Sequence, residues 1–505
     1  MFSIQSALNR KLFLVISDRQ ILVLWLSILF IYRIAVINTL HVDVFFDEAY
    51  YYFWSQNIEW GYYSKPPVVA WLIAISTALF GPTELGLKIF SPLLYTLTGY
   101  VVFEFAKTLY SERIALLAAV IFSSTPLIGF NSLFITTDAP LLFFWSITCL
   151  YFVRALNSTS LSVWVLLGIY SGLGLLSKYS FIVLLFGLLL FVILQGRFRL
   201  LYSPRCLVAL FICIALFSTN LIWNGQHNFI AFSHTRDIAQ LNKSLFHFDQ
   251  LAEFLLAQVI AFGLVWTTVV VGTIHTKWNC LLQNDRMLLL ACITVPILLI
   301  IAIQAFLSRA FVNWAAPFVI GASIITALTI IKLDKKVLIL GLLVNLLLLS
   351  LAYHWPQLLE LANVPQHRGN SPYYRLAGWR EVSFKCEQTL SRYPQATVVS
   401  DSRELLSYIG FYNGLHISQL SFWNPQRTDI ANHYDLLSNI GDIKKRDKQD
   451  YLFLSAKPIS FDIQQSFEQI NLVEVVRFQF NTEIHRKVYI YHAVNFEDYP
   501  DAEKI

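Results

Sequence analysis

The chain has 505 residues, of which 56% are hydrophobic and only 14% are charged, and its mean hydropathy is +0.57. A soluble enzyme of this length carries far more charge, so the composition excludes that class and indicates a membrane protein with many spans. The formal net charge of +5 is then evidence on membrane topology rather than a sign of nucleic-acid binding. Most of the six cysteines lie in or beside apolar runs, so no disulfide framework is predicted.

Apolar windows of the length that crosses a bilayer recur along the first two thirds of the chain. They predict eleven transmembrane helices, at residues 20–40, 84–107, 114–131, 138–154, 161–176, 179–195, 206–223, 253–273, 287–307, 314–331 and 336–354. An odd number of spans places the two termini on opposite sides of the membrane. Because Lys and Arg concentrate in the loops on the N-terminal side, we predict a cytoplasmic N-terminus.

The segment 66–80 is apolar but is only 15 residues long, and two prolines begin it. Prolines are tolerated in the first turn of a helix, whereas this length is short for a span. We therefore predict a helix that lies along the outer interface. A crossing here would move every later loop to the other side and would remove the charge bias.

After residue 354 the composition becomes polar, and the chain divides into a transmembrane domain at 1–354 and a soluble domain at 355–505. Strands are predicted at 396–400, 451–454, 472–480 and 487–492, with helices at 402–411 and 461–469. The predicted fold is thus a polytopic α-helical membrane protein with a small extracytoplasmic α/β domain.

One stretch, residues 45–71, packs acids, aromatic residues and a lysine between two apolar runs: FFDEAYYYFWSQNIEWGYYSKPPVVAW. The acid pair Asp47 and Glu48 follows the first span by a few residues, and Lys65 stands before the two prolines. Ionised groups near a bilayer are costly, so they tend to pair, to line a wet cavity or to act in catalysis. A solvated loop is the ordinary alternative for the acid pair.

The predicted topology places three more charged residues on the same outer side, namely Asp138, Lys178 and Arg309. Each also has an ordinary explanation. Asp138 suits a helix N-cap, Lys178 suits a snorkelling lysine, and Arg309 suits a membrane anchor. Together, however, they add an acid and two cations to the side that already holds Asp47 and Lys65.

These residue types fit one kind of chemistry. Lys and Arg neutralise a leaving phosphate at headgroup level, and a carboxylate deprotonates a hydroxyl as a general base. Tyr51 and Tyr63 suit contacts with a sugar face, although aromatic residues also form the belt at a membrane surface. The pattern predicts group transfer from a lipid phosphate to an acceptor hydroxyl.

Six motifs follow one another along the chain: DEAYYYFW, YYSKPPVVAWL, FITTDAPLLFFW, LLSKYS, LIWNGQHNF and VNWAAPF. In this order they resemble the integral-membrane GT-C glycosyltransferases of the protein O-mannosyltransferase type, which include the bacterial aminoarabinose transferase of lipid A. The resemblance covers roughly residues 25–330. It implies a polytopic enzyme of the bacterial inner membrane, an active site that faces away from the cytoplasm, a polyprenyl-phosphate-linked sugar donor and inversion at the anomeric carbon.

The resemblance also implies roles for single residues. Asp47 matches the acid that activates the acceptor hydroxyl, Asp138 matches the second acid, and Glu48 is included with them as a residue that orients its neighbour. Lys65 matches the lysine before the prolines. The predicted set for the donor phosphate or substrate is Lys65, Lys178, Arg309, Tyr51 and Tyr63.

Some features depart from the family pattern or leave alternatives open. Ser64 precedes Lys65, where the aminoarabinose transferase has Glu, so the identity of the sugar is open. The acceptor is lipid A, a surface glycan or a protein. A divalent metal is left open, with His227 as the candidate ligand. A transporter or flippase of a lipid-linked sugar is the alternative function, although such proteins usually show internal repeats and broken helices at mid-membrane, and no repeat is evident here.

Overall fold

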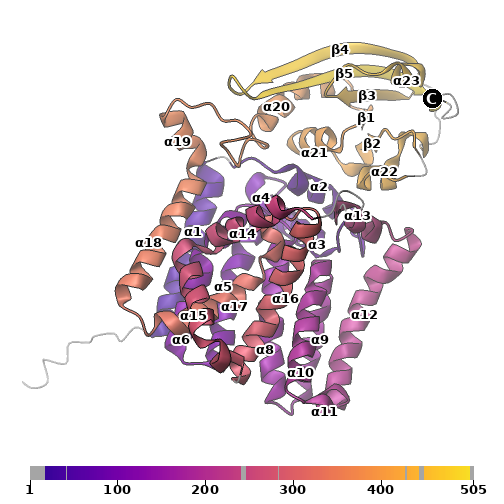
Figure 1. Ribbon diagram of the computed structural model, residues 1–505. Helices are drawn as coiled ribbons and strands as arrows, with labels where there is room; N and C mark the ends of the chain where they lie inside the picture. The colour runs from indigo at the N-terminus through magenta and orange to yellow at the C-terminus, as the bar shows by residue number, and fades with distance from the viewer. Residues whose placement is uncertain are drawn as a thin grey trace, which may run out of the picture.

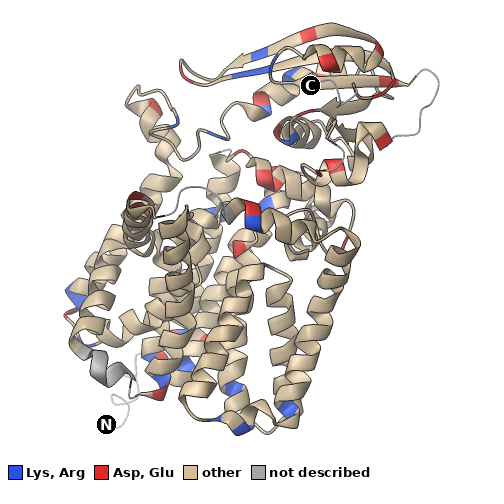
Figure 2. Ribbon diagram, turned by 45° about the vertical axis from the view of Figure 1, so that its right-hand side comes forward, with Lys and Arg blue, Asp and Glu red and all other residues tan. Residues whose placement is uncertain are grey.

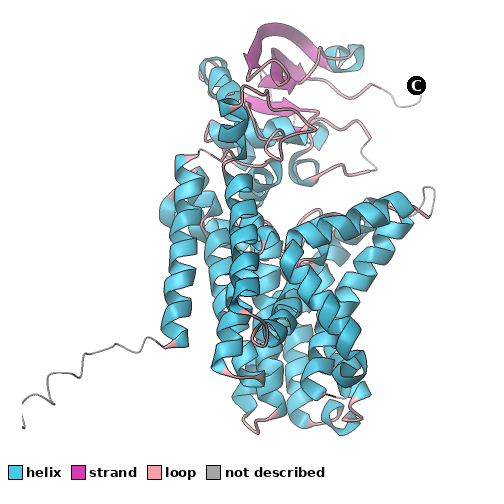
Figure 3. Ribbon diagram, turned by 60° about the vertical axis from the view of Figure 1, so that its left-hand side comes forward, coloured by secondary structure: helices cyan, strands magenta, loops and turns pink. Residues whose placement is uncertain are grey.

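The computed structural model describes residues 17–40, 42–239, 246–282, 284–426, 429–442 and 449–500. A bundle of helices forms one end of the molecule and a mixed β-sheet covers the other (Figure 1). All strands of the described residues lie at that second end (Figure 3). The N-terminal residues 1–16, which contribute to the topology prediction, lie outside the described residues.

Among the described residues, six helical segments are long and apolar enough to cross a membrane. They are α1 (Asp18–Thr39), α4 and α5 together (Glu84–Leu109), α8 (Asp138–Leu156), α12 (Pro204–Gln226), α16 (Asp285–Leu307) and α18 (Lys335–Tyr353). A seventh span results if α14 (Phe248–Phe262) and α15 (Leu264–Leu282) count as one, although they are bent by 107°. Gly263 separates this pair with φ +107°, a conformation that L side chains rarely adopt.

The other four predicted spans coincide with shorter helices. These are α6 (Glu112–Ser124) with α7 (Pro126–Asn131), α9 (Leu161–Leu175), α10 (Ile182–Leu194) and α17 (Phe318–Ile330). All eleven predicted segments are therefore helical, but the number that crosses a membrane stays a prediction. Lys and Arg gather at the end of the bundle opposite the sheet (Figure 2), which is the distribution that the predicted topology requires.

Short helices lie between the bundle and the sheet (Figure 1). They are α2 (Phe46–Ser55), α3 (Val68–Phe80), α4 (Glu84–Lys88) and α13 (Ile230–Ala239). The segment predicted as an interfacial helix is α3, which starts after Pro67 and packs against α2 and α4. Its helical structure is confirmed, and its position along the membrane surface stays a prediction.

The C-terminal region contains a five-stranded sheet in the order β2-β1-β3-β5-β4. The strands are β1 (Thr397–Ser400), β2 (Leu420–Phe422), β3 (Asp450–Ser455), β4 (Phe467–Gln479) and β5 (His485–Phe496). Its helices are α19 (Trp355–Leu361), α20 (Trp379–Leu390), α21 (Arg403–Tyr412), α22 (His433–Ser438) and α23 (Phe461–Gln465). β1 pairs in parallel with β2 and β3, whereas β5 pairs antiparallel with β3 and β4.

The sequence predicts part of the secondary structure of this region correctly. The four predicted strands and the helix at 402–411 are confirmed. The predicted helix at 461–469 is wrong beyond Gln465, because β4 already begins at Phe467 and pairs with β5 at Phe496. Strand pairing across the sheet outweighs the local helical pattern there.

The C-terminal region shares a hydrophobic core with the outer helices. Buried residues of α2, such as Tyr50, Phe53 and Trp54, belong to the same cluster as Leu406 and Ile409 of α21. The two helices approach so closely that a Cβ on Gly410 would lie 2.7 Å from the ring of Phe53. The domain boundary at residue 354 stays a prediction, but packing fixes the sheet region directly over α2.

Candidate active site

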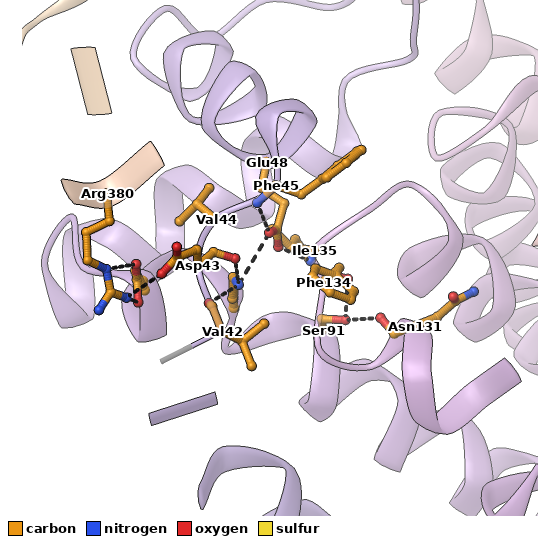
Figure 4. A network of polar contacts seen from close by, with 12 residues as sticks. Val42, Asp43, Val44, Phe45, Glu48, Ser91, Asn131, Phe134, Ile135 and Arg380 are labelled. Atoms are coloured by element: carbon orange, nitrogen blue, oxygen red, sulfur yellow. Dashed lines mark hydrogen bonds and ion pairs between the residues drawn. The ribbon is translucent and has the colours of Figure 1, made fainter. Parts of the chain in front are cut away.

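Glu48 forms the centre of a buried network at the start of α2 (Figure 4). One carboxylate oxygen accepts a hydrogen bond of 2.8 Å from the backbone N–H of Phe45, and the other accepts one of 2.6 Å from the N–H of Ile135. The Nζ of Lys88 lies 3.5 Å from the first oxygen, and neither charged side chain is exposed. Glu48 thus joins α2 to the loop that leads to Asp138.

The same network reaches the C-terminal region. Lys88 donates hydrogen bonds of 2.6 and 2.8 Å to the carbonyl oxygens of Val42 and Asp43, and the carboxylate of Asp43 lies 3.2 Å from the guanidinium of Arg380 on α20 (Figure 4). We call Glu48, Lys88, Asp43 and Arg380 the Glu48 network. Because its members are occupied by protein partners, Glu48 is placed to hold the site together rather than to touch a substrate.

Asp138 begins α8 and is only 1% exposed. The Nζ of Lys178 lies 2.6 Å from one of its carboxylate oxygens, and the side-chain amide of Asn313 donates a hydrogen bond of 2.6 Å to the other. Lys178 lies just before a 3₁₀ turn at Tyr179–Phe181, and Asn313 lies in a second such turn at Val312–Ala315. Three connections between helices therefore meet at this carboxylate.

Asp47 differs from both of these acids. It is half-buried, and no described residue forms a hydrogen bond or an ion pair with its carboxylate. Burial raises the pKa of Asp47, and the nearby cations Arg403, Lys65 and Arg375 lower it, in that order of strength. A carboxylate of this kind can accept a proton without first breaking a contact within the protein.

Lys65 lies among the same groups. Burial and the positive charge of Lys178 lower the pKa of its ammonium group, as does Arg403, whereas Asp47 and Asp138 raise it. The start of α3 is tied to the end of α9 by a hydrogen bond of 3.2 Å from the N–H of Val68 to the carbonyl of Leu176. This link explains why two lysines far apart in the sequence reach the same site.

Arg403 was not predicted from the sequence. It is the first residue of α21, and its guanidinium lies over the rings of Phe46, at 5.3 Å, and Tyr50, at 5.5 Å. These rings flank Asp47 on α2. An arginine in the polar tail carries no local pattern that points to this site, because only the packing of α21 on α2 brings it there. We call Asp47, Lys65, Asp138, Lys178 and Arg403 the charged cluster.

The two predicted tyrosines lie beside the charged cluster. Tyr51 is 6% exposed and packs on Trp54 at 4.6 Å between ring centres, and the negative charges of Asp47 and Asp138 raise its pKa beyond the effect of burial. The ring of Tyr63 packs on that of His234 at 4.8 Å, and the nearby Arg403 lowers the pKa of Tyr63, which burial raises. Both stay candidates for contacts with a substrate.

Two other predicted residues show no contact with the charged cluster among the described residues. Arg309 is exposed, its guanidinium lies 5.8 Å from the ring of Phe311, and the described residues show no hydrogen bond, ion pair or ring contact between it and the charged cluster. The charge pattern assigns a basic residue at a span end to one side of the membrane, whichever way its side chain points. The side chain of Arg309 is solvated. The structure therefore does not support its predicted contact with the donor.

His227 caps α12, where its Nδ1 lies 2.7 Å from the carbonyl oxygen of Trp223 and its ring stacks on the indole at 4.1 Å. Within the described part of the chain, no group of three or more His, Cys, Asp or Glu side chains could hold a metal ion. The residues around His227 thus do not form a metal site, and the question of a divalent metal stays open.

Comparisons with known proteins show what the whole chain is similar to. Residues 64–223 match the family model described as dolichyl-phosphate-mannose-protein mannosyltransferase. The chain is 29% identical over 390 residues to the lipid A galacturonosyltransferase RgtD of Rhizobium johnstonii, a match that covers 75% of this chain and 79% of that protein. It is 28% identical over 253 residues to an undecaprenyl phosphate-alpha-4-amino-4-deoxy-L-arabinose arabinosyl transferase of Erwinia tasmaniensis, a match that covers 47% of this chain and 45% of that protein.

The fold has a counterpart among solved structures. ArnT from Cupriavidus metallidurans, bound to undecaprenyl phosphate, superposes with a TM-score of 0.65 over 93% of this chain and 97% of that chain, at 14% identity. Because this likeness includes the C-terminal region as well as the helical bundle, it shows a common overall fold. Together the comparisons confirm the resemblance predicted from the sequence, because the chain is similar to membrane glycosyltransferases that include a lipid A galacturonosyltransferase and the aminoarabinose transferases.

Proposed function

We propose that the protein transfers a sugar from a polyprenyl-phosphate-linked donor to a hydroxyl group of a lipid acceptor of the lipid A type. The observation that carries this proposal is the carboxylate of Asp47, which is unpaired among the described residues and lies near Lys65 and Arg403. Lys65 in turn lies near the Asp138–Lys178 ion pair. The named relatives support it, because they are transferases of galacturonic acid and aminoarabinose.

The chemistry follows from the charges. Asp47 accepts the proton of the acceptor hydroxyl while the hydroxyl oxygen attacks the anomeric carbon of the sugar. The bond from that carbon to the phosphate oxygen breaks, and the oxygen keeps the electron pair, so that polyprenyl phosphate leaves with one more negative charge. Attack opposite to the leaving group inverts the configuration at the anomeric carbon.

Lys65 is placed to stabilise the leaving phosphate, because a positive charge near a developing negative charge favours the transition state over the ground state. Lys178 is held by Asp138 at 2.6 Å, and Asn313 holds the second oxygen of Asp138. This arrangement gives Asp138 a role in orienting Lys178 toward the donor. It also keeps a third cation close without leaving its charge unpaired.

Several finer points belong to the same proposal. The protein crosses the bacterial inner membrane eleven times, with its N-terminus in the cytoplasm and the sheet region in the periplasm. The basic end of the bundle opposite the sheet supports this orientation (Figure 2). The charged cluster then lies at the outer end of the bundle, level with the headgroups, where a phosphate on a polyprenyl chain would sit.

A direct assay tests the function. The purified protein is placed in liposomes that contain lipid A and a set of polyprenyl phosphate sugars, and mass spectrometry of lipid A records the added sugar. We expect a product with the wild-type protein and none with Asp47→Asn, while the variant keeps its thermal unfolding temperature. Full activity of Asp47→Asn would exclude Asp47 as the base.

The same liposomes test the transporter alternative, which none of the comparisons supports. Movement of a labelled lipid-linked sugar across the bilayer, with no covalent product on any acceptor, would favour transport over transfer.

A further inference from the structure

The guanidinium of Arg403 has no acidic partner among the described residues. Its contacts are the rings of Phe46 and Tyr50, at 5.3 and 5.5 Å. Arg403 is also the charged residue that most strongly affects Asp47, although the two side chains form no ion pair. The side chain is only half-buried. Two aromatic faces thus hold a cation in place while its hydrogen-bond donors remain available.

The cations of the charged cluster come from two parts of the fold. Lys65 and Lys178 come from connections at the end of the bundle, whereas Arg403 comes from α21, which packs on the opposite side of α2 (Figure 1). The polyprenyl chain of a donor lies in the bilayer, so its phosphate lies on the bundle side, near the lysines. A donor bound in this way would direct its sugar toward Asp47 and Arg403.

The chemistry of this position favours one class of sugar. A planar guanidinium with a free fork of N–H donors matches a carboxylate in two parallel hydrogen bonds. A cationic amino sugar would bring its charge close to Arg403 and Lys65, which already repel each other through their like charges. A neutral sugar would leave the guanidinium without an acidic partner in a partly desolvated site.

Building on the function proposed above, we propose that Arg403 binds the carboxylate of a uronic acid on the donor and selects a polyprenyl phosphate hexuronate as the substrate. The C-terminal region then supplies a residue for sugar specificity and completes the active site, rather than only covering it. The relative from Rhizobium johnstonii transfers a sugar of this class by its name.

The test compares donors that differ in this one group. Transfer is measured with polyprenyl phosphate linked to a hexuronic acid, to the matching neutral hexose and to a 4-amino pentose, for the wild type and for Arg403→Gln. We expect the wild type to prefer the hexuronate. Arg403→Gln should lower kcat/KM for the hexuronate about 100-fold, mainly by raising KM, and should change the value for the neutral hexose by less than about threefold.

Arg380→Gln is the matched control. Arg380 also belongs to the C-terminal region, but its partners are the protein carboxylates of Asp43 and Glu84. This variant should lower the unfolding temperature and leave the ratio between hexuronate and hexose unchanged. If Arg403→Gln does not fold, Arg403→Lys is used instead, because it keeps the charge and loses the planar fork. It should lower kcat/KM about tenfold for the hexuronate and for no other donor.

Two results would overturn the inference. One is an equal loss on all donors in the Arg403 variants, which would assign Arg403 to the phosphate, to the acceptor or to Asp47. The other is a wild-type preference for the neutral or the amino sugar. A wild-type protein that transfers none of the three donors would instead contradict the proposed function itself, so the two failures are distinguishable.

Discussion

Asp47 and Glu48 are neighbours on α2, yet they face two different environments. Glu48 is fully buried and holds two backbone N–H groups and Lys88, whereas Asp47 is half-buried and has no direct partner among the described residues. Successive residues on a helix point about 100° apart, so one acid can face the core while the next stays partly exposed. The pair therefore divides into an acid that is tied to protein partners and an acid that we propose as the general base.

This difference shows how the site is built. The Glu48 network anchors α2, the loop before Asp138 and α20 to one another, and the charged cluster uses the position that results. A reactive carboxylate with a raised pKa is costly to the fold, so its neighbours must hold the backbone firmly. Substitutions can separate the two roles.

The largest effect is expected for Asp47→Asn. Without a general base, kcat should fall about 1,000-fold, while stability stays close to that of the wild type because no contact with a described residue is lost. Initial rates of sugar transfer and thermal unfolding in detergent measure the two properties. Asp237→Asn, at an exposed acid on α13, is the control and should keep its activity. A large loss of stability in Asp47→Asn would show that Asp47, like Glu48, supports the fold.

Glu48→Gln should act on the fold instead. It leaves the buried ammonium of Lys88 without its charge partner, which lowers the free energy of unfolding by about 3–5 kcal/mol. Chemical denaturation in detergent measures the change. The double variant Glu48→Gln with Lys88→Met removes both charges and should recover much of the stability. If the single variant were as stable as the wild type, the Glu48 network would not be the anchor of α2.

Asn313→Ala tests the support of Asp138. It removes one of the two contacts of that carboxylate and keeps the ion pair with Lys178, so kcat/KM should fall about tenfold. Asn157→Ala, at the opposite end of α8, is the matched control and should leave transfer unchanged. An unchanged rate in Asn313→Ala would show that Asp138 orients Lys178 without the hydrogen bond from Asn313.

The pH dependence should move in a defined direction. Asp47 acts when ionised, so activity rises with pH through its pKa, which burial raises above 3.8 and Arg403 lowers. Arg403→Gln removes the cation, raises this pKa and should shift the acid limb of kcat/KM to higher pH by about one unit. The neutral hexose donor is used, so that the sugar carboxylate does not contribute. A shift to lower pH would contradict the assignment of Asp47.

The smallest effect is expected for Arg309→Gln. Its guanidinium is solvated and lies over Phe311, and the described residues show no contact between it and the charged cluster, so transfer should change by less than about twofold. The assay is the same as for Asp47→Asn. A loss of tenfold or more would place Arg309 in contact with the donor, as the sequence resemblance implied.

Much of the site was predictable because its residues occur in loops between apolar runs. The alternation of spans assigns each loop to a side, so the sequence pattern alone groups Asp47, Lys65, Asp138 and Lys178. Arg309 met the same criterion and does not join them. The side of the membrane is a property of the sequence pattern, but the direction of a side chain at a span end is not.

Asn313 and Arg403 show the opposite case. Asn313 lies in a motif noted in the sequence, yet its role depends on a hydrogen bond to a residue on another helix. Arg403 lies in a polar tail where arginine is common. In the fold, four of the five strands of this tail were predicted and β2 was not, and the prediction was wrong at residues 467–469, where pairing with β5 decides the structure.

The amino-acid sequence is enough to indicate a membrane protein, where its helices lie and which stretch gathers charged and aromatic residues. These properties follow from local physics, since lipid requires long apolar runs and makes every charge near it costly. Which acid stays unpaired, and which cations surround it, depends instead on how the chain packs. Electrostatic and hydrogen-bond contacts depend on distance in space, and the packing of α21 on α2 brings Arg403 to Asp47 across most of the chain.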